Sequence, residues 1–128
     1  MIVDSSAIVA IVKGEKEQLR LIRALAGASV VRVAAPTWVE TSMVLRGPLG
    51  SRLDAVLSGI ERQFGIEFVP FEREHIAVAL DAWHRYGRGQ HTAKLNFGDC
   101  ISYATARVAG EPLLFVGNDF SQTDIVAA

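Results

Sequence analysis

The chain has 128 residues and carries 13 Lys or Arg residues against 14 Asp or Glu residues, for a net charge of −1. This length suits a single domain over residues 1–128, and the near-neutral charge excludes a globally basic surface, so any contact with nucleic acid must come from a local cluster. The N-terminus is apolar but short and contains Asp4, and the chain has one cysteine, so we expect no signal peptide, no membrane span and a cytoplasmic protein.

Short apolar segments alternate with helical patterns along the chain. Residues 1–3 are uniformly apolar, as in a strand buried on both faces, and Asp4-Ser5-Ser6 is suited to capping a short helix over Ala7–Val12. Further strands are predicted at Ser29–Ala34, Ile66–Val69 and Leu113–Val116, and further helices at Lys16–Ala26, Pro36–Leu45, Leu49–Phe64, Phe71–Tyr86 and Asp99–Ala109. This alternation predicts an α/β fold in which a central parallel β-sheet is flanked by α-helices.

Two of the predicted helices carry more specific expectations. Gly47-Pro48 is expected to end the helix that begins at Pro36, because proline lacks the amide hydrogen that a helix needs. In the helix at Phe71–Tyr86, the helical spacing of the apolar side chains predicts that four of them face the core: Ile76, Ala79, Leu80 and Trp83.

Two aspartates follow predicted strands directly or closely. Asp4 comes after the first strand, and Asp119 comes after the last one, behind Gly117-Asn118. Ligands of parallel sheets bind beyond the carboxyl ends of the strands, where the strand order reverses, so the two side chains can meet there. Each aspartate taken singly also fits an ordinary turn or helix cap.

Two further acids, Glu40 and Asp99, belong to predicted helices. Glu40 has Pro36 and Met43 among its helical neighbours and therefore lies on a largely apolar face, where an unpaired charge is costly to bury. The alternative is that Glu40 lies at the edge of this face and reaches water. Asp99 opens a helix, where the helix dipole also favours an acid and where Asn96 can serve as the cap.

Four acids at one sheet edge would repel one another, and a divalent cation would allow them to stay ionised together. Ligation by carboxylates alone favours Mg²⁺ or Mn²⁺ over zinc. The three histidines, His75, His84 and His91, show no metal-ligand spacing with each other or with Cys100, which argues against a zinc site.

Several strings in the chain resemble PIN-domain ribonucleases. They are the opening hydrophobic-Asp-Ser-Ser-Ala string, the acid in Val39-Glu40-Thr41, and above all NFGDC at residues 96–100 and GNDF at residues 117–120, which resemble VapC-type toxins of bacterial toxin–antitoxin pairs. The resemblance spans residues 1 to about 126. It implies a single PIN-like domain and a type II toxin that acts as an endoribonuclease dependent on Mg²⁺ or Mn²⁺.

The resemblance also implies roles for individual residues. Asp4 and Asp99 would be the main metal ligands, and Glu40 and Asp119 would complete a catalytic quartet. Two polar residues, Ser6 and Asn118, would form hydrogen bonds to these acids or to the substrate. The number of metal ions and the role of Asp124 stay open.

The partners implied by the resemblance are an RNA substrate, a cognate antitoxin and a second copy of the chain in a homodimer. Met43, Val44 and Leu45, together with the helix at Leu49–Phe64, offer a candidate groove for a partner helix. The same residues equally fit an ordinary hydrophobic core, and the sequence does not separate these two alternatives.

A basic segment without acids runs from His84 to Lys94. Arg85, Arg88 and Lys94 are candidate contacts to RNA phosphates, and an aromatic residue in this segment can stack on a base. The same cations also fit a solvated helix end, where they favour the helix dipole, so both explanations stay open.

Other functions of acidic α/β domains fit the sequence less well. A receiver-type signalling domain needs a phosphoacceptor aspartate after a middle strand, but Pro70-Phe71 follows the strand that ends at Val69. A phosphatase with an aspartyl nucleophile needs a second aspartate two positions after the first, where Ser6 stands. A catalytically inactive PIN-like domain that binds RNA or serves as a scaffold is disfavoured by the complete acid set but stays the alternative.

Overall fold

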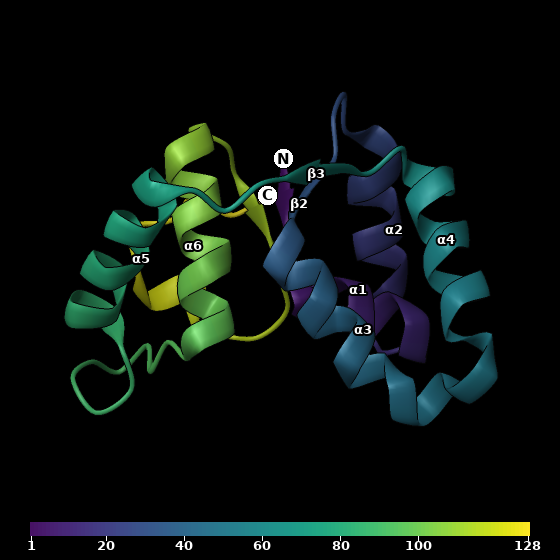
Figure 1. Cartoon of the computed structure of the whole chain (residues 1–128), viewed down its shortest axis with the longest axis horizontal. Helices are drawn as coiled ribbons and strands as arrows, with labels where there is room; N and C mark the ends of the chain where they lie inside the picture. The colour runs from purple at the N-terminus through teal and green to yellow at the C-terminus, as the bar shows by residue number, and fades with distance from the viewer.

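Four short parallel strands form the centre of the computed structural model, which describes residues 1–128 (Figure 1). The strands are β1 (Ile2–Val3), β2 (Arg32–Ala34), β3 (Glu67–Val69) and β4 (Leu113–Leu114). The helices are α1 (Ser5–Lys13), α2 (Gln18–Gly27), α3 (Ala35–Leu49), α4 (Leu53–Phe64), α5 (Arg73–Tyr86) and α6 (Phe97–Ala109), with 3₁₀ turns η1 (Gly50–Arg52) and η2 (Phe120–Gln122). The predicted α/β fold is confirmed. None of its helices is both long and apolar enough to cross a membrane.

The strand order is β3-β2-β1-β4, so the chain changes direction across the sheet at β1. Ile2 pairs with Arg32 of β2 on one side and with Leu113 of β4 on the other. The amide of Asp4 extends this pairing, because it donates a hydrogen bond of 2.9 Å to the carbonyl of Leu114. The carboxyl ends of β1 and β4 therefore adjoin at the topological switch point, where parallel sheets commonly bind ligands.

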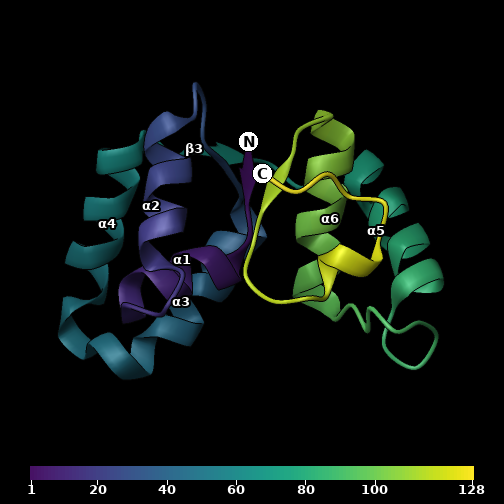
Figure 2. The ribbon, with the colours of Figure 1, turned by 180° about the vertical axis from the view of Figure 1, so that it is seen from behind.

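Helices cover both faces of the sheet, which explains why its central strands are uniformly apolar. Val3 and Leu114 belong to a core shared with α1, α2 and α4, whereas Ile2 and Leu113 belong to a second core shared with α5 and α6. Figure 2 shows these two groups of helices on opposite sides of the strands. Alternate residues of one strand thus fill two different cores.

Helix α6 begins two residues earlier than predicted because Asn96 and Asp99 form a capping box. The side chain of Asn96 accepts a 3.0 Å hydrogen bond from the amide of Asp99, and the Asp99 carboxylate accepts one of 2.7 Å from the amide of Asn96. Gly110 ends the helix in the left-handed conformation. Most of α6 is buried, so the helix is a fixed support for any residue that it carries.

The prediction that Gly47-Pro48 ends the third helix is wrong. Helix α3 continues to Leu49, and η1 then leads into α4. Pro48 removes only the hydrogen bond to the carbonyl four residues earlier, in the last turn of α3, where the helix is about to end in any case.

The predicted inward face of α5 is also wrong for three of its four residues. Ile76, Leu80 and Trp83 are exposed, Leu80 by 55%, and only Ala79 packs against the core. The buried positions are His75 and Ala82, with further partly buried side chains at Val78 and Tyr86. Helix α5 carries two apolar stripes of similar period, and the stripe that contains Val78, Ala79 and Ala82 is the one that joins the core with α6.

The candidate groove along α3 and α4 is largely an ordinary core. Leu45, Leu53 and Leu57 are buried together, and Ile60 is buried in the neighbouring core. Met43 and Val44 are exposed on α3. Of the apolar side chains in the candidate groove, Met43 and Val44 are thus the large exposed ones, while Val56 and Phe64 are partly buried.

Candidate active site

Among the acids at the switch point, Asp4 accepts the most hydrogen bonds. It caps α1 and is 3% exposed. Its Oδ2 accepts hydrogen bonds from the amide of Ser6 at 2.9 Å and from Ser6 Oγ at 2.5 Å, and its Oδ1 accepts one from Ser102 Oγ at 2.6 Å. Ser6 Oγ in turn accepts a 3.1 Å hydrogen bond from the amide of Val116 after β4. One carboxylate thus links β1, β4 and α6 in a single orientation.

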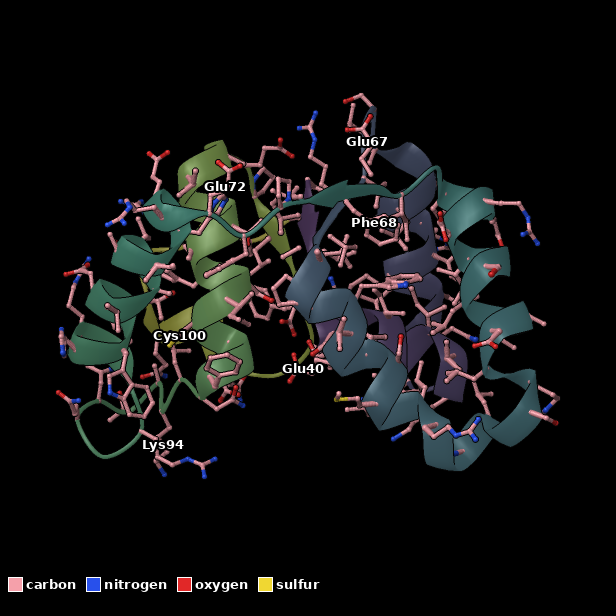
Figure 3. All side chains as sticks on the ribbon, viewed as in Figure 1. Glu40, Glu67, Phe68, Glu72, Lys94 and Cys100 are labelled. Carbon is pink, nitrogen blue, oxygen red and sulfur yellow. The ribbon has the colours of Figure 1, made fainter.

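Glu40 projects from α3 toward the first turn of α6, as Figure 3 shows. A Cβ atom at Gly98 would stand only 2.5 Å from Glu40 Oε1, so the carboxylate occupies the space that the glycine leaves free. Burial raises the pKa of Glu40, the charge of Asp4 raises it further, and a hydrogen bond with Ser5 partly opposes both effects. Glu40 is therefore a half-buried acid that faces another acid.

Asp99 lies one residue further along the same turn of α6. Burial raises its pKa to about 6, which the hydrogen bond from the Asn96 amide partly offsets. The charges of Asp4, Asp119 and Glu40 add to the increase in that order. All three predicted partners thus lie close enough to Asp99 to act on its titration.

Asp119 and Asn118 lie in the exposed loop that follows β4. Asp119 directly precedes η2, whose first residue, Phe120, is buried. The carbonyl of Asn118 accepts a 2.6 Å hydrogen bond from Ser121 Oγ, which tightens this turn. The structure brings the four predicted acids to one sheet edge, with Asp119 on its most exposed side.

The residues at this edge suit a hard divalent cation. No three His, Cys, Asp or Glu side chains already form a complete metal-binding group, but the charges of the other three acids raise the pKa of Asp99, and a cation would relieve that repulsion. The donor set is oxygen only. Burial and the charge of Asp99 raise the pKa of the nearby Cys100 to about 11, so its thiol stays protonated and is a poor zinc ligand.

Two residues of the site, Ser102 and Gly98, were not predicted from the sequence. Ser102 of α6 donates a hydrogen bond to Asp4 that joins residues 98 positions apart, so no local pattern indicates it. Gly98 had no assigned role. A glycine in the first turn of a helix, directly before an acid, is the only local sign of the space that Glu40 needs.

The three basic candidates for RNA contact lie in different surroundings. Arg85 forms hydrogen bonds of 3.3 Å to both Asp81 and Asp124, and its guanidinium lies 4.7 Å from the centre of the Tyr86 ring. These neighbours raise the pKa of Arg85 and favour a structural role for it.

Arg88 and Lys94 are exposed beside the start of α6. Arg88 lines an apolar groove of about 640 Å³ between α5 and α6, together with Asn96 and Phe97. Lys94 adopts the left-handed conformation, with φ of 54°, and Figure 3 shows its position in the loop before α6. Both cations thus lie near the end of α6 that carries Asp99.

Comparisons with known proteins add independent information. The PIN domain family model matches residues 1–126. Ribonuclease VapC36 of Mycobacterium tuberculosis is 45% identical over 126 residues, which cover 98% of this chain and 91% of that protein. The crystal structure of Mycobacterium tuberculosis VapC20, a sarcin-ricin loop cleaving toxin, matches with a TM-score of 0.79 and 21% identity over 99% of this chain and 97% of that one. A toxin–antitoxin complex from Klebsiella pneumoniae matches with a TM-score of 0.76 and 15% identity, over 99% and 95% of the two chains.

Proposed function

This chain belongs to the PIN-domain family and has VapC ribonucleases among its relatives, and on this premise we propose that it is the toxin of a type II toxin–antitoxin pair. It is a metal-dependent endoribonuclease that hydrolyses phosphodiester bonds in RNA. The observation that carries the activity is the convergence of Asp4, Glu40 and Asp99 at the switch point of the sheet, with Asp119 beside them. The complete acid set argues against an inactive scaffold.

Mg²⁺ or Mn²⁺ is the proposed ion, with Asp4 and Asp99 as its main ligands and Glu40 and Asp119 as the remaining acids of the quartet. When bound, such an ion lowers the pKa of a water molecule and neutralises charge on the phosphodiester. Hydrogen bonds from Ser6 and Ser102 keep Asp4 in one orientation, which reduces the reorganisation that ligation requires.

The substrate-binding roles are proposed for exposed residues around the acids. Asn118 stands next to Asp119 and is free to contact the RNA backbone. Arg88 and Lys94 supply positive charge near Asp99, which would hold flanking phosphates. Arg85 contributes less directly, because Asp81 and Asp124 already bind its guanidinium.

A second copy of the chain is the proposed occupant of the groove between α5 and α6. Its lining is mostly apolar and includes Leu80, Trp83 and Phe97, and Phe97 is 80% exposed. A patch of this kind on a soluble protein marks a protein interface. Phe97 projects from the same face that carries the groove. This arrangement suits a two-fold interface, in which each copy inserts its Phe97 into the groove of the other.

A cognate antitoxin is proposed to bind this protein. Met43 and Val44 are exposed on α3, on the same helix as Glu40, and are the proposed contacts. An antitoxin bound there would lie close to the acids. An RNA substrate and a single buried cysteine both fit the cytoplasm as the place of action.

The test of the activity uses purified protein and a structured RNA. Cleavage is expected with Mg²⁺ or Mn²⁺ and is expected to stop when EDTA removes the ion. Asp4→Asn and Asp99→Asn should each abolish cleavage and retain the circular dichroism spectrum, whereas Asp54→Asn, an exposed acid on α4, should cut at the wild-type rate. Full cleavage by either site variant, or cleavage that continues in EDTA, would refute the assignment.

A further inference from the structure

Asp124, in the C-terminal tail, is bonded to a buried tyrosine of α6. The hydroxyl of Tyr103 donates a 2.6 Å hydrogen bond to Asp124 Oδ1, and Tyr103 is 1% exposed. Arg85 of α5 donates a 3.3 Å hydrogen bond to Oδ2, and Arg107 of α6 lies 4.0 Å from the same oxygen. One carboxylate therefore attaches the tail to both helices on this side of the sheet.

The loop that carries Asp119 has little regular structure of its own. Between Phe115 and Asp124 it contains only the three-residue turn η2. Its first anchor is Phe120, which is buried and packs against Phe115 with ring centres 5.0 Å apart. The second anchor is Asp124. Asp119 itself has no anchor of this kind, so its position depends on these two.

A short chain of hydrogen bonds connects the second anchor to the turn beside Asp119. Thr123 Oγ1 donates a 2.7 Å hydrogen bond to the carbonyl of Phe120 and accepts one of 3.2 Å from the amide of Ile125. Thr123 directly precedes Asp124. Release of the Asp124 carboxylate would therefore loosen the turn that begins next to Asp119.

The same helix holds two of the four acids, Asp4 and Asp99, and also binds the tail that follows Asp119. Helix α6 carries Asp99 in its first turn, and Ser102 on the next turn donates to Asp4. The adjacent residue, Tyr103, binds Asp124. Successive residues of one buried helix thus contact the strand-end acid after β1 and the tail that follows β4.

The bond between Tyr103 and Asp124 is partly buried, because its donor belongs to a buried side chain and its acceptor to an exposed one. Hydrogen bonds to ionised acceptors are the stronger class. The hydrogen bond from Tyr103 is the main cause of a lowered pKa of Asp124, so this carboxylate is ionised at neutral pH.

We propose that Tyr103 and Asp124 are positioning residues, which hold the loop of residues 115–125 so that Asp119 faces Asp4 and Asp99. The inference rests on the proposed function, in which Asp119 belongs to the metal-binding quartet. It assigns to Asp124 a role that its sequence context left open.

The first test compares Tyr103→Phe with Tyr86→Phe in the full chain. Tyr86 is the matched control because its hydroxyl contacts Arg85 but not Asp124, and its ring lies 5.9 Å from that of Tyr103. In metal-free protein, Tyr103→Phe should speed hydrogen exchange of the amides from residue 116 to residue 124 at least about tenfold. In calorimetric titrations it should weaken Mn²⁺ binding several-fold. The control should leave both quantities unchanged.

The second test is a double-mutant cycle on Mn²⁺ affinity. If Tyr103 acts through Asp119, Tyr103→Phe should cause no further loss of affinity when Asp119→Asn is already present. Additive losses, or normal exchange and affinity in Tyr103→Phe, would overturn the inference while leaving the proposed function intact. Absence of Mn²⁺ binding by the wild-type protein would instead overturn the proposed function, and the inference with it.

Discussion

The carboxylate of Glu40 lies over Gly98 so closely that a Cβ atom at that position would stand 2.5 Å from Oε1 and 2.6 Å from Oε2. This contact joins an acid of α3 to the first turn of α6, where the positive end of the helix dipole favours negative charge. It also makes Gly98 part of the site, although glycine contributes no functional group. The space left by its missing side chain is what Glu40 occupies.

Replacing Gly98 by alanine should therefore reduce cleavage without unfolding the protein. The clashing atoms belong to the flexible end of Glu40, which can rotate away, and alanine is favoured over glycine in a helix by up to about 1 kcal/mol. We expect unchanged or slightly higher thermal stability and a loss of cleavage rate of about tenfold or more. Gly59→Ala on α4 is the control, because a Cβ there meets no atom within 4 Å. Wild-type cleavage by Gly98→Ala would show that the position of Glu40 is unimportant.

Removal of the Ser102 hydroxyl should affect both stability and cleavage. Ser102→Ala loses the 2.6 Å hydrogen bond to Asp4 Oδ1, and hydrogen bonds to charged groups contribute about 1.5–3 kcal/mol. We expect urea denaturation to show a loss of this size and cleavage assays to show a slower rate. Thr105→Val removes another buried hydroxyl of α6, one that donates to the carbonyl of Ile101, and should lower stability without slowing cleavage. Equal cleavage by the two variants would contradict a specific role for Ser102.

The raised pKa of Asp99 predicts a pH-dependent stability in the absence of metal. Between its ordinary pKa of 3.8 and its folded value of about 6, the folded state binds more protons than the unfolded state, so stability falls as pH rises through this interval. Asp99→Asn should remove this effect. In EDTA, the variant should be more stable than wild type by about 1–2 kcal/mol above pH 6 and equally stable below pH 4. A difference that does not change with pH would contradict the prediction.

Wild-type cleavage should also depend on pH in the same interval. Protonation of Asp99 below pH 6 competes with the cation, so the Mg²⁺ concentration needed for half-maximal cleavage should rise as the pH falls. The measurement is a Mg²⁺ titration of the initial cleavage rate at several pH values between 5 and 8.

Arg88→Ala should weaken RNA binding in a salt-dependent manner. If Arg88 neutralises one phosphate, the slope of log affinity against log salt should decrease in magnitude by about 0.7. Filter-binding measurements in Ca²⁺, which limits cleavage, at several salt concentrations test this. Arg52→Ala, an exposed arginine of η1, is the control and should keep the wild-type slope. An unchanged slope in Arg88→Ala would leave Arg88 as an ordinary solvated cation.

A negative charge in the groove between α5 and α6 should separate the two copies of the chain. Leu80→Glu would bury an unpaired carboxylate at the proposed interface, and an uncompensated buried charge costs about 3–5 kcal/mol. Light scattering should show the mass of one chain instead of two. Leu19→Glu on α2 is the matched control, because Leu19 is also exposed but lies outside the groove. Dimers that persist in Leu80→Glu would exclude this face as the interface.

Local patterns in the sequence were sufficient to predict much of the fold. Residues 1–3 are apolar without alternation, which correctly indicated a strand buried on both faces, and the apolar run predicted as a strand at Leu113–Val116 contains β4. Asp4 and Asn96 were recognised as helix-capping residues, and both are N-caps. These features depend on hydrogen bonds and side chains within a few residues, so the sequence contains them directly.

The inward face of α5 was not predictable in the same way. The stripe containing Ile76, Leu80 and Trp83 and the stripe containing His75 and Ala82 have nearly the same helical period. Only the packing of α5 on α6 selects the stripe that contains Ala82, with Val78 and Ala79 beside it. The exposed stripe then forms the groove proposed as an interface, a surface that the sequence pattern alone assigned to the core.

Local features of the chain point to the four acids, because Asp4, Asp99 and Asp119 follow strands or begin a helix and Glu40 stands on a largely apolar helix face. What holds these acids in place depends instead on contacts between distant parts of the chain. Asp4 is bonded to Ser102, 98 residues away, and Asp124 is bonded to Tyr103. These partners meet because α6 packs beside β1 and β4, and no pattern of neighbouring residues records which side chains a buried helix presents to strands distant in the chain.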